Sequence, residues 1–368
     1  MKARAVSCIV CLNLQSKTWH RGELLAFPYA FNLLQRQNKH FSQMEFSDKL
    51  FYDIQGVIKL YIKDIKTDTL GNIIAHKPGN GKRIMLIAHH DVVRLMVTHI
   101  DERGFLYFKP AGGIDASILP ARKVVIRHGD KGYAGVIGKK PIHFIREEQN
   151  NKVSYENLWI DLGVKDKKES IDKIAIGDYA YFSPDYERLP DGLISGPYFD
   201  NYAGVYVLME LVEQLYKTDI PWDLYIVASN HEEIGLRGAA VAAYSIKPDI
   251  CICIDATHAT DYPTTNIINE GDIKLGDGCV LAKGPNIFPE LFNSLENVAN
   301  EHDIKYQLEV SPYPTGTDAN VIQMSIEGIK TALISIPCRY MHTPYEICSQ
   351  KDIESAIKLI EGFLRVKY

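Results

Sequence analysis

The sequence of 368 residues predicts an α/β fold, in which a mixed, mainly parallel sheet is flanked by helices and a small β-barrel is inserted. Apolar runs with the length of buried strands support the sheet, at residues 84–88, 224–228, 250–254 and 331–336. Apolar residues with helical spacing lie between and after these runs. From about 97 to 190 that spacing gives way to short, glycine-bounded strands, which predict a β-rich unit that interrupts the sheet.

The regular pattern begins near residue 48. Residues 48–62 predict a helix, residues 68–75 a strand of hairpin type, and residues 84–88 a buried strand. Residues 1–45 fit no such pattern, and Met44 is a conceivable alternative start. We therefore expect an irregular N-terminal extension over 1–45 that precedes the sheet.

After the insert, three groups of apolar residues at helical spacing predict helices. The first group is Leu208, Leu211, Val212 and Leu215; the second is Leu291, Leu295 and Val298; the third is Ile353, Ile357 and Ile360. Ser349 and Asp352 are spaced as a capping pair for the last helix. The resulting division is an extension (1–45), an α/β domain in two pieces (46–96 and 191–368) and a β-rich insert (97–190).

Charge and cysteine content exclude several classes of protein. The 41 basic and 46 acidic residues give a net charge of −5 without a long block of either sign, so neither nucleic acid nor a membrane surface is an expected partner. An odd number of cysteines, seven, favours a reducing cytoplasm over a disulfide framework. Cys8 and Cys11 have CxxC spacing, but no second pair accompanies them. Residues 5–14 resemble the start of a signal peptide without a convincing cleavage site, so we expect a soluble cytoplasmic protein.

Acidic and histidine side chains follow the apolar runs. His89 and Asp91, Glu232 and Glu233, Asp255, and His342 each come shortly after one of the four, and Asp200 precedes a predicted helix. Ligands bind outside the carboxyl ends of strands in open, mainly parallel sheets, so we expect these seven side chains to converge. Five carboxylates beside two imidazoles would repel one another unless cations compensate them. Two divalent ions would do so, and oxygen and nitrogen donors suit zinc, cobalt or manganese.

Each residue also has a simpler interpretation. Asp200 could be a helix N-cap, and Glu232 and Glu233 could be first-turn carboxylates that interact with a helix dipole. His342 could be an ordinary loop histidine. Asp318 could either shape a substrate pocket or cap a helix. The joint placement of these residues after strand ends favours a metal site, because independent caps would not require it.

Six motifs in chain order resemble those of the tetrahedral aminopeptidases. They are His89-His-Asp91, Gly196-Pro-Tyr-Phe-Asp-Asn201, His231-Glu-Glu-Ile-Gly-Leu-Arg-Gly-Ala239, Ile254-Asp-Ala-Thr257, Gly316-Thr-Asp-Ala319 and Arg339-Tyr-Met-His-Thr-Pro344. That family comprises co-catalytic di-metal peptidases, including glutamyl and deblocking aminopeptidases, some of them labelled endoglucanases. The resemblance runs from about residue 48 to the C-terminus and implies a phosphorylase/hydrolase-like di-zinc peptidase fold.

The resemblance also implies roles for these residues. One metal, zinc in the first instance, would bind His89 and Asp255, a second would bind Glu233 and His342, and Asp200 would bridge them. Glu232 would act as general base on a water shared by the two ions, and Asp91 would fix the His89 ring. The substrates would be short peptides, cleaved one N-terminal residue at a time. The insert would mediate dimerisation, and dimers would assemble into a tetrahedral dodecamer.

The chain departs from the family pattern after His89-His-Asp91, where Val92-Val-Arg94 replaces the usual Glu-Ile-Gly. Arg94 could tune substrate choice, pair with a site carboxylate or form a surface salt bridge. The usual turn near the start of the domain is not recognisable. Two other functions compete with the aminopeptidase. One is glycoside hydrolysis by a carboxylate pair, which leaves both histidines without a role; the other is a non-catalytic peptide-binding assembly.

Overall fold

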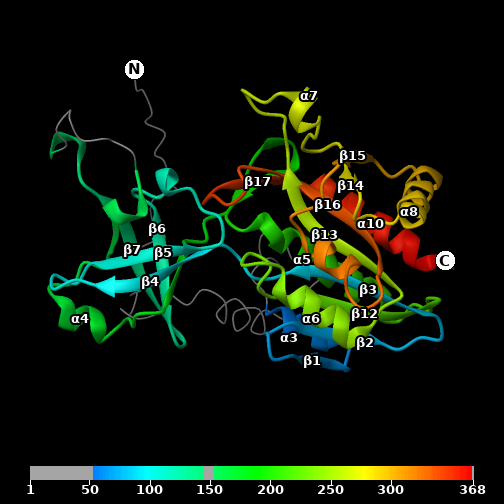
Figure 1. Cartoon of the computed structure of the whole chain (residues 1–368), viewed down its shortest axis with the longest axis horizontal. Coiled ribbons are helices and arrows are strands. Elements are labelled where there is room, and N and C mark those ends of the chain that lie inside the picture. Colours follow the sequence, from blue (N-terminus) through cyan, green and yellow to red (C-terminus); the bar gives the residue numbers. More distant parts are fainter. Residues whose placement is uncertain (1–52, 145–152, 367–368) are drawn as a thin grey trace, which may run out of the picture.

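The computed structural model describes residues 53–144 and 153–366. The expected extension over 1–45 and the Cys8–Cys11 pair lie outside these residues. In the described part, one lobe is built around a mixed sheet and the other around a closed β-barrel (Figure 1). The predicted fold class, an α/β sheet with an inserted barrel, is confirmed.

The sheet runs from edge to edge in the order β1, β2, β12, β3, β13, β16, β17, β11, β10, and β14 and β15 branch from β16. The bounds are β1 (Ile65–Thr67), β2 (Ile73–Lys77), β3 (Lys82–His89), β10 (Glu187–Arg188), β11 (Leu193–Gly196), β12 (Trp222–Ser229), β13 (Ile250–His258), β14 (Cys279–Lys283), β15 (Tyr306–Val310), β16 (Lys330–Arg339) and β17 (Glu346–Ser349). The four strands at the centre, β12, β3, β13 and β16, are parallel neighbours. Their carboxyl ends therefore lie at one edge of the sheet.

Helices cover both faces of this parallel centre, which explains why β13 has eight consecutive buried residues instead of an alternating pattern. α5 (Phe199–Leu215) packs on β3 and β13. α3 (Ile54–Tyr61) and α10 (Gln350–Arg365) pack on α5, and α10 also packs on α8 (Pro289–Glu301). α6 (Arg237–Ile246) and α9 (Asp318–Gln323) form a second group (Figure 1). α7 (Ile267–Glu270) is short and projects from the lobe. None of the helices in the described residues combines the length and apolar character that crossing a membrane requires.

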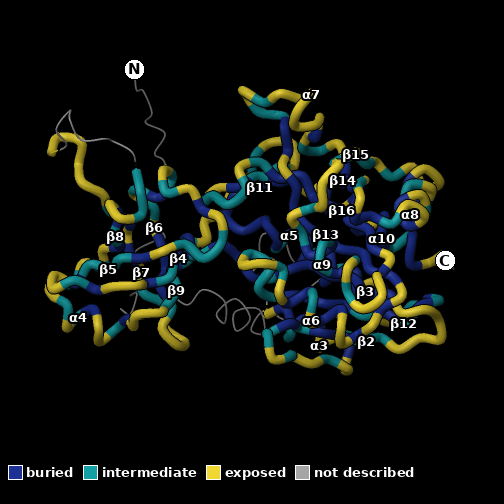
Figure 2. The backbone as a smooth tube through the Cα atoms, in the orientation of Figure 1, coloured by how far each residue is buried: buried dark blue, intermediate teal, exposed yellow. Residues whose placement is uncertain are grey.

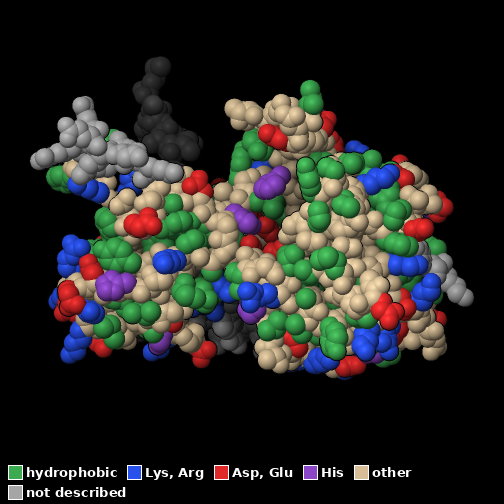
Figure 3. All heavy atoms as spheres, viewed as in Figure 1, with side chains coloured by type: hydrophobic (Ala, Val, Ile, Leu, Met, Phe, Trp, Pro, Cys, Tyr) green, Lys and Arg blue, Asp and Glu red, His purple; other side chains and the backbone are tan. Residues whose placement is uncertain are grey.

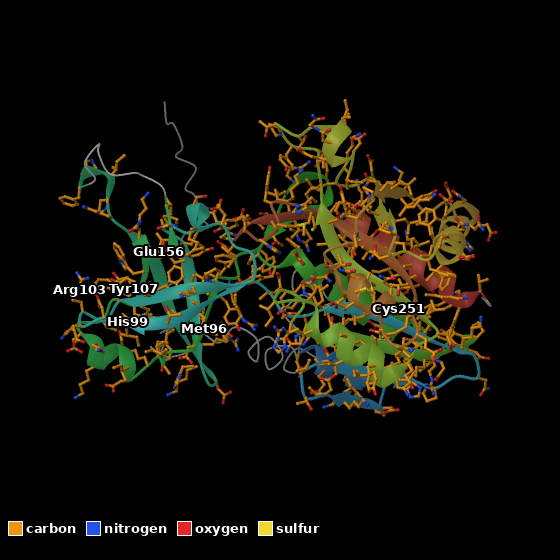
Figure 4. The ribbon with its side chains drawn as sticks, in the orientation of Figure 1. Met96, His99, Arg103, Tyr107, Glu156 and Cys251 are labelled. Carbon is orange, nitrogen blue, oxygen red and sulfur yellow. The ribbon has the colours of Figure 1, made fainter. Side chains whose placement is uncertain are left out.

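The barrel closes in the order β4, β5, β8, β7, β6, β9. These strands are β4 (Arg94–Ile100), β5 (Leu106–Ala111), β6 (Lys123–His128), β7 (Lys131–Lys139), β8 (Leu158–Asp161) and β9 (Tyr179–Phe182), and α4 (Lys167–Ile171) lies outside them. His99 and Tyr107 are opposite each other on β4 and β5 (Figure 4). Leu106, Ile126 and Ile160 are buried members of one apolar cluster, and Figure 2 shows buried positions along the barrel strands. The barrel therefore has an apolar core of its own.

Two local predictions differ from the structure. Residues 68–72 form the turn of the β1–β2 hairpin instead of its strand, because the Asp68 carboxylate accepts hydrogen bonds from the Leu70 and Asn72 backbone. Ser349 caps α10 by accepting from the Lys351 N–H, but the Asp352 carboxylate does not complete the capping pair. It accepts instead from the backbone of Gly276 and Gly278, so a tertiary contact replaces the local one.

Candidate active site

His89 is the last residue of β3, and its ring is oriented by its own loop. Nδ1 lies 3.0 Å from the backbone carbonyl of Asp91, which can only accept, so Nδ1 carries the proton. Nε2 then faces two carboxylates, at 3.2 Å from Asp200 Oδ1 and 3.4 Å from Asp255 Oδ1. Burial by itself lowers the pKa of His89, but the charge of Asp255 and the hydrogen bonds with Asp200 and Asp255 outweigh it, and the pKa lies well above its usual value.

Asp200 lies between the two histidines. Its Oδ2 is 3.2 Å from His342 Nε2, while its Oδ1 faces His89. Burial alone would raise the pKa of Asp200, but hydrogen bonds from His342 and His89 hold it well below its usual value. The residue precedes a cis peptide bond with Asn201, and its side chain points at the histidines instead of capping α5. The simple N-cap interpretation of Asp200 is therefore wrong.

The Asp91 carboxylate organises the acidic pair that follows β12. Its Oδ1 accepts from the Glu232 N–H at 2.9 Å, and its Oδ2 accepts from the Glu233 N–H at 3.3 Å. Both glutamates lie in the turn before α6, which begins only at Arg237, so they are not first-turn residues of that helix. The Asp91 carboxylate is 3.7 Å from His89 Nδ1, farther than the backbone carbonyl of the same residue.

Glu232 and Glu233 are crowded by other carboxylates in a buried setting. Burial raises the pKa of Glu232 to about 9 and the pKa of Glu233 to about 7. Glu233 Oε2 lies 3.4 Å from His342 Nε2, whereas Glu233 Oε1 is buried and has no hydrogen-bond partner among the described residues. A buried carboxylate oxygen without a partner is costly, and a cation would satisfy it.

Two groups of three donors result. His89, Glu232 and Asp255 form one, and Asp200, Glu233 and His342 form the other; within each, the potential ligand atoms lie within 4.8 Å of one another. Oxygen and imidazole nitrogen atoms at such spacing suit zinc, cobalt or manganese. The carboxylates that stabilise a proton on these rings would stabilise a divalent cation in its place. The chemistry of each group therefore fits a metal ion.

Glu346, on β17, is a site residue that sequence reasoning missed. It is buried, and its Oε2 accepts from the Asp200 N–H at 3.0 Å while its Oε1 accepts from the His342 N–H at 2.9 Å. One carboxylate thus holds the backbone of two predicted ligands. The only signal in the sequence was a lone acidic residue at the start of Glu346-Ile-Cys-Ser349, four positions after His342.

The site opens into a cavity of about 600 Å³ at the hollow between the two lobes, where histidine and acidic side chains gather (Figure 3). Its lining comes mostly from the sheet lobe, but Gly113, just after β5, contributes from the barrel side. A carbon added to Gly113 would lie 3.3 Å from His342 Nδ1, so the Gly113 backbone stands against that ring. Both lobes therefore contact the site.

Asp318 and Arg94, two further residues considered as site residues from the sequence, do not line the cavity. Asp318 is the first residue of α9, and its Oδ2 accepts from the buried Ser229 hydroxyl at 2.6 Å, so it neither lines the cavity nor caps the helix. Burial raises its pKa to about 7. Arg94 lies over the ring of Tyr179, with 4.3 Å between the guanidinium carbon and the ring centroid. None of the ion pairs among the described residues involves Arg94.

Comparison with known families identifies the chain. The family model described as M42 glutamyl aminopeptidase matches residues 71–359. The chain belongs to the M42 family. It is therefore a hydrolase with aminopeptidase activity, and the predicted resemblance is confirmed.

Known relatives of this M42 aminopeptidase cover most of its length. A lysyl aminopeptidase of Pyrococcus furiosus is 39% identical over 316 residues, which are 84% of this chain and 89% of the relative. The solved aminopeptidase APDkam598 of Desulfurococcus kamchatkensis has a TM-score of 0.79 at 34% identity, covering 85% of this chain and 88% of the other. The TET1 peptidase of Pyrococcus horikoshii, which can assemble into a tetrahedron or a large octahedral shell, has a TM-score of 0.75 at 28% identity, covering 91% and 99%.

All seven predicted site residues of this M42 aminopeptidase lie within the matched range. The M42 family is metal-dependent, and the two donor groups could each hold a metal ion. The segment 1–45 lies outside the match.

Proposed function

We propose that this M42 aminopeptidase removes N-terminal residues from short peptides at a site that holds two divalent metal ions. The proposal rests on the position of Asp200 between two histidines. Its two carboxylate oxygens each lie 3.2 Å from a different ring, that of His89 and that of His342. In this proposal His89 and Asp255 would hold one ion, Glu233 and His342 would hold the other, and Asp200 would contribute to both. The buried Glu233 Oε1, which has no partner in the described part of the chain, supports a cation at this position.

Two divalent ions, with zinc as the first candidate, would lower the pKa of water and polarise a peptide carbonyl. Glu232 is the proposed general base. Its side chain lines the cavity, and its Oε2 lies 3.9 Å from His89 Nε2. It takes a proton from the attacking water and returns that proton to the leaving amine. Asp91 fixes the backbone of Glu232 and, through its own carbonyl, the ring of His89.

The test uses aminoacyl fluorogenic substrates and a panel of dipeptides. Chelation should abolish release of N-terminal residues, and about two equivalents of zinc, cobalt or manganese should restore it. Glu232→Gln should retain both metals, as elemental analysis would measure. Its kcat should fall by at least about a hundred-fold. Glu327→Gln, at an exposed position, is the control with the same charge change.

Other outcomes would favour the competing functions. Full activity of chelated, metal-free protein on these substrates would contradict the mechanism. Metal-independent cleavage of a soluble glucan would revive glycoside hydrolysis, and two bound metal equivalents without cleavage of any dipeptide would favour a peptide-binding assembly.

We also propose that the insert (97–190) forms a dimer contact and that dimers build a closed tetrahedral dodecamer in the cytoplasm. Two large apolar side chains at the barrel surface support this: Ile142 is 73% exposed and Phe144 is 69% exposed. The tetrahedral and octahedral shells of the Pyrococcus horikoshii peptidase support the higher assembly. The cytoplasmic location is supported by the five described cysteines, which are all buried thiols.

A further inference from the structure

The side chains that line the cavity, all of which belong to the described residues, include several carboxylates and no lysine or arginine. Apart from the carboxylates assigned above to metal binding and proton transfer, one acidic side chain lines it, Glu309 on β15. A negatively charged substrate side chain would therefore meet a carboxylate and no permanent cation.

Glu309 is held in place without being neutralised. Its Oε2 accepts a hydrogen bond from the Thr257 hydroxyl at 2.9 Å. Within the described residues, no lysine, arginine or histidine forms an ion pair with it, and His258, which also lines the cavity, is exposed. Asp261 shows the contrast, since Arg339 binds both of its oxygens at 2.7 and 2.6 Å. Glu309 is thus a half-buried carboxylate that one hydrogen bond orients and that has no ion-pair partner among the described residues.

The position of Glu309 follows from the strand beneath it. Asp255 and Thr257 both line the cavity and are separated by one residue of β13, so they lie on one face of the strand about 7 Å apart. Glu309 is hydrogen-bonded to Thr257, whereas Asp255 belongs to the proposed metal site. The four-carbon stem of a lysine side chain suits the span from a scissile bond near Asp255 to a carboxylate near Thr257.

We propose that Glu309 binds the side chain of the substrate's N-terminal residue and makes the enzyme prefer lysine and arginine at that position. This inference rests on the proposed aminopeptidase function and assigns the substrate class of the same site. A hydrogen bond between a cation and a half-buried carboxylate is stronger than one between neutral groups, because it adds charge attraction that solvent only partly screens. Acidic N-terminal residues are excluded by repulsion from the same carboxylate.

The test compares lysyl with norleucyl aminomethylcoumarin, two substrates that share the unbranched four-carbon stem and differ in the terminal ammonium. Wild-type enzyme should have a kcat/KM at least about ten-fold higher for the lysyl substrate. Glu309→Gln should lower the lysyl kcat/KM by about ten-fold and so bring that ratio close to one. Glu290→Gln, exposed on α8 and remote from the cavity lining, removes the same charge and should keep the ratio. Retained norleucyl turnover also shows that the variants are folded.

Charge reversal sharpens the test. Glu309→Lys should invert the preference, so that glutamyl aminomethylcoumarin is cleaved faster than the lysyl substrate. An equal loss on lysyl and norleucyl substrates in Glu309→Gln would mean that Glu309 binds the α-ammonium common to both, and it would overturn the inference. Equal turnover of the two substrates by wild-type enzyme would overturn it too, while leaving the proposed function intact.

Binding separates the inference from the proposed function. Calorimetry should show lysinamide binding to the metal-loaded wild type about ten-fold more tightly than norleucinamide, and Glu309→Gln should bind both alike. That result without turnover of any substrate would support the specificity assignment and contradict the proposed function.

Discussion

The carboxylate of Glu346 accepts a hydrogen bond from the backbone N–H of Asp200 at 3.0 Å, from a strand 146 positions later in the chain. Its second oxygen accepts from the N–H of His342, so one buried side chain sets the separation between two of the proposed ligands. Burial raises the pKa of Glu346 well above its usual value.

Replacement of Glu346 by glutamine should therefore weaken metal binding. The amide can accept from one of the two N–H groups but presents a donor to the other, which leaves a buried group unpaired. We expect zinc affinity to fall by about 10- to 100-fold, measured by competition with a chromophoric chelator. Glu354→Gln, exposed on α10, should bind zinc like the wild type. Unchanged affinity in Glu346→Gln would show that this carboxylate does not position the ligands.

Metal ions should stabilise the fold. The described site gathers buried carboxylates whose mutual repulsion a cation would relieve, and a ligand that binds only the folded state adds about 2.7 kcal/mol at one hundred times its dissociation constant. Zinc should therefore raise the unfolding temperature in a concentration-dependent way. Asp200→Asn should reduce this shift, because Asp200 belongs to one donor group and its Oδ1 also faces His89 of the other. An unfolding temperature that does not respond to zinc would contradict metal binding here.

Gly113→Ala should impair activity with little effect on stability. An added methyl group would lie 3.3 Å from His342 Nδ1, so the ring would have to shift by a few tenths of an ångström. We expect kcat/KM to fall by about ten-fold, because catalysis is sensitive to small displacements. Gly129→Ala in the β6–β7 turn of the barrel has a φ of +56° and no described atom within 4 Å of the added carbon, so it should cost some stability through backbone strain and keep the wild-type kcat/KM. Equal activities would mean that the His342 ring tolerates this contact.

Asp352 should make stability depend on pH. Burial raises its pKa to about 7, above the value of about 4 expected in the unfolded chain. The folded state therefore binds the proton more tightly; this stabilisation is fully present below about pH 4 and is lost as the pH rises through about 7. The advantage in unfolding free energy of wild type over Asp352→Asn should shrink across this range. Urea titrations at several pH values measure it, and a constant or growing difference would contradict the assignment.

Phe144→Asp should weaken the proposed dimer. A charge in an apolar interface is costly, so the variant should elute as smaller species in size-exclusion chromatography with light scattering. Ile176→Asp, between α4 and β9 in the same insert and 64% exposed, is the control. If both variants keep the wild-type mass, the Phe144 surface is not the contact.

The central strands and their polar ends were predictable because the signal is local. An apolar run such as 250–254 predicts a strand buried on both faces, and the carboxyl ends of parallel strands meet by geometry. His89, Asp255 and the glutamate pair could therefore be grouped from sequence. The branch formed by β14 and β15, which carries Glu309, was not predicted, since nothing local specifies where such a strand pairs.

The missed and corrected details share one cause, which is that distant partners decide them. Glu346 is indistinguishable from a surface glutamate until Asp200 and His342 lie beside it. Asp352 satisfies the spacing of a capping pair, yet the backbone of Gly276 and Gly278 binds it instead. The Arg94 guanidinium stacks on the ring of Tyr179 instead of pairing with a carboxylate of the described residues.

The turn at Gly112 and Gly113 has a consequence for any attempt to miniaturise this enzyme. An added methyl group on Gly112 would lie 3.4 Å from Glu233 Oε2. The turn after β5 therefore lies directly beside the active site in the sheet lobe. A truncated form without the barrel would leave one flank of the reaction chamber open to bulk water. A minimal version of the enzyme must therefore keep this turn or replace it with another close-fitting backbone segment.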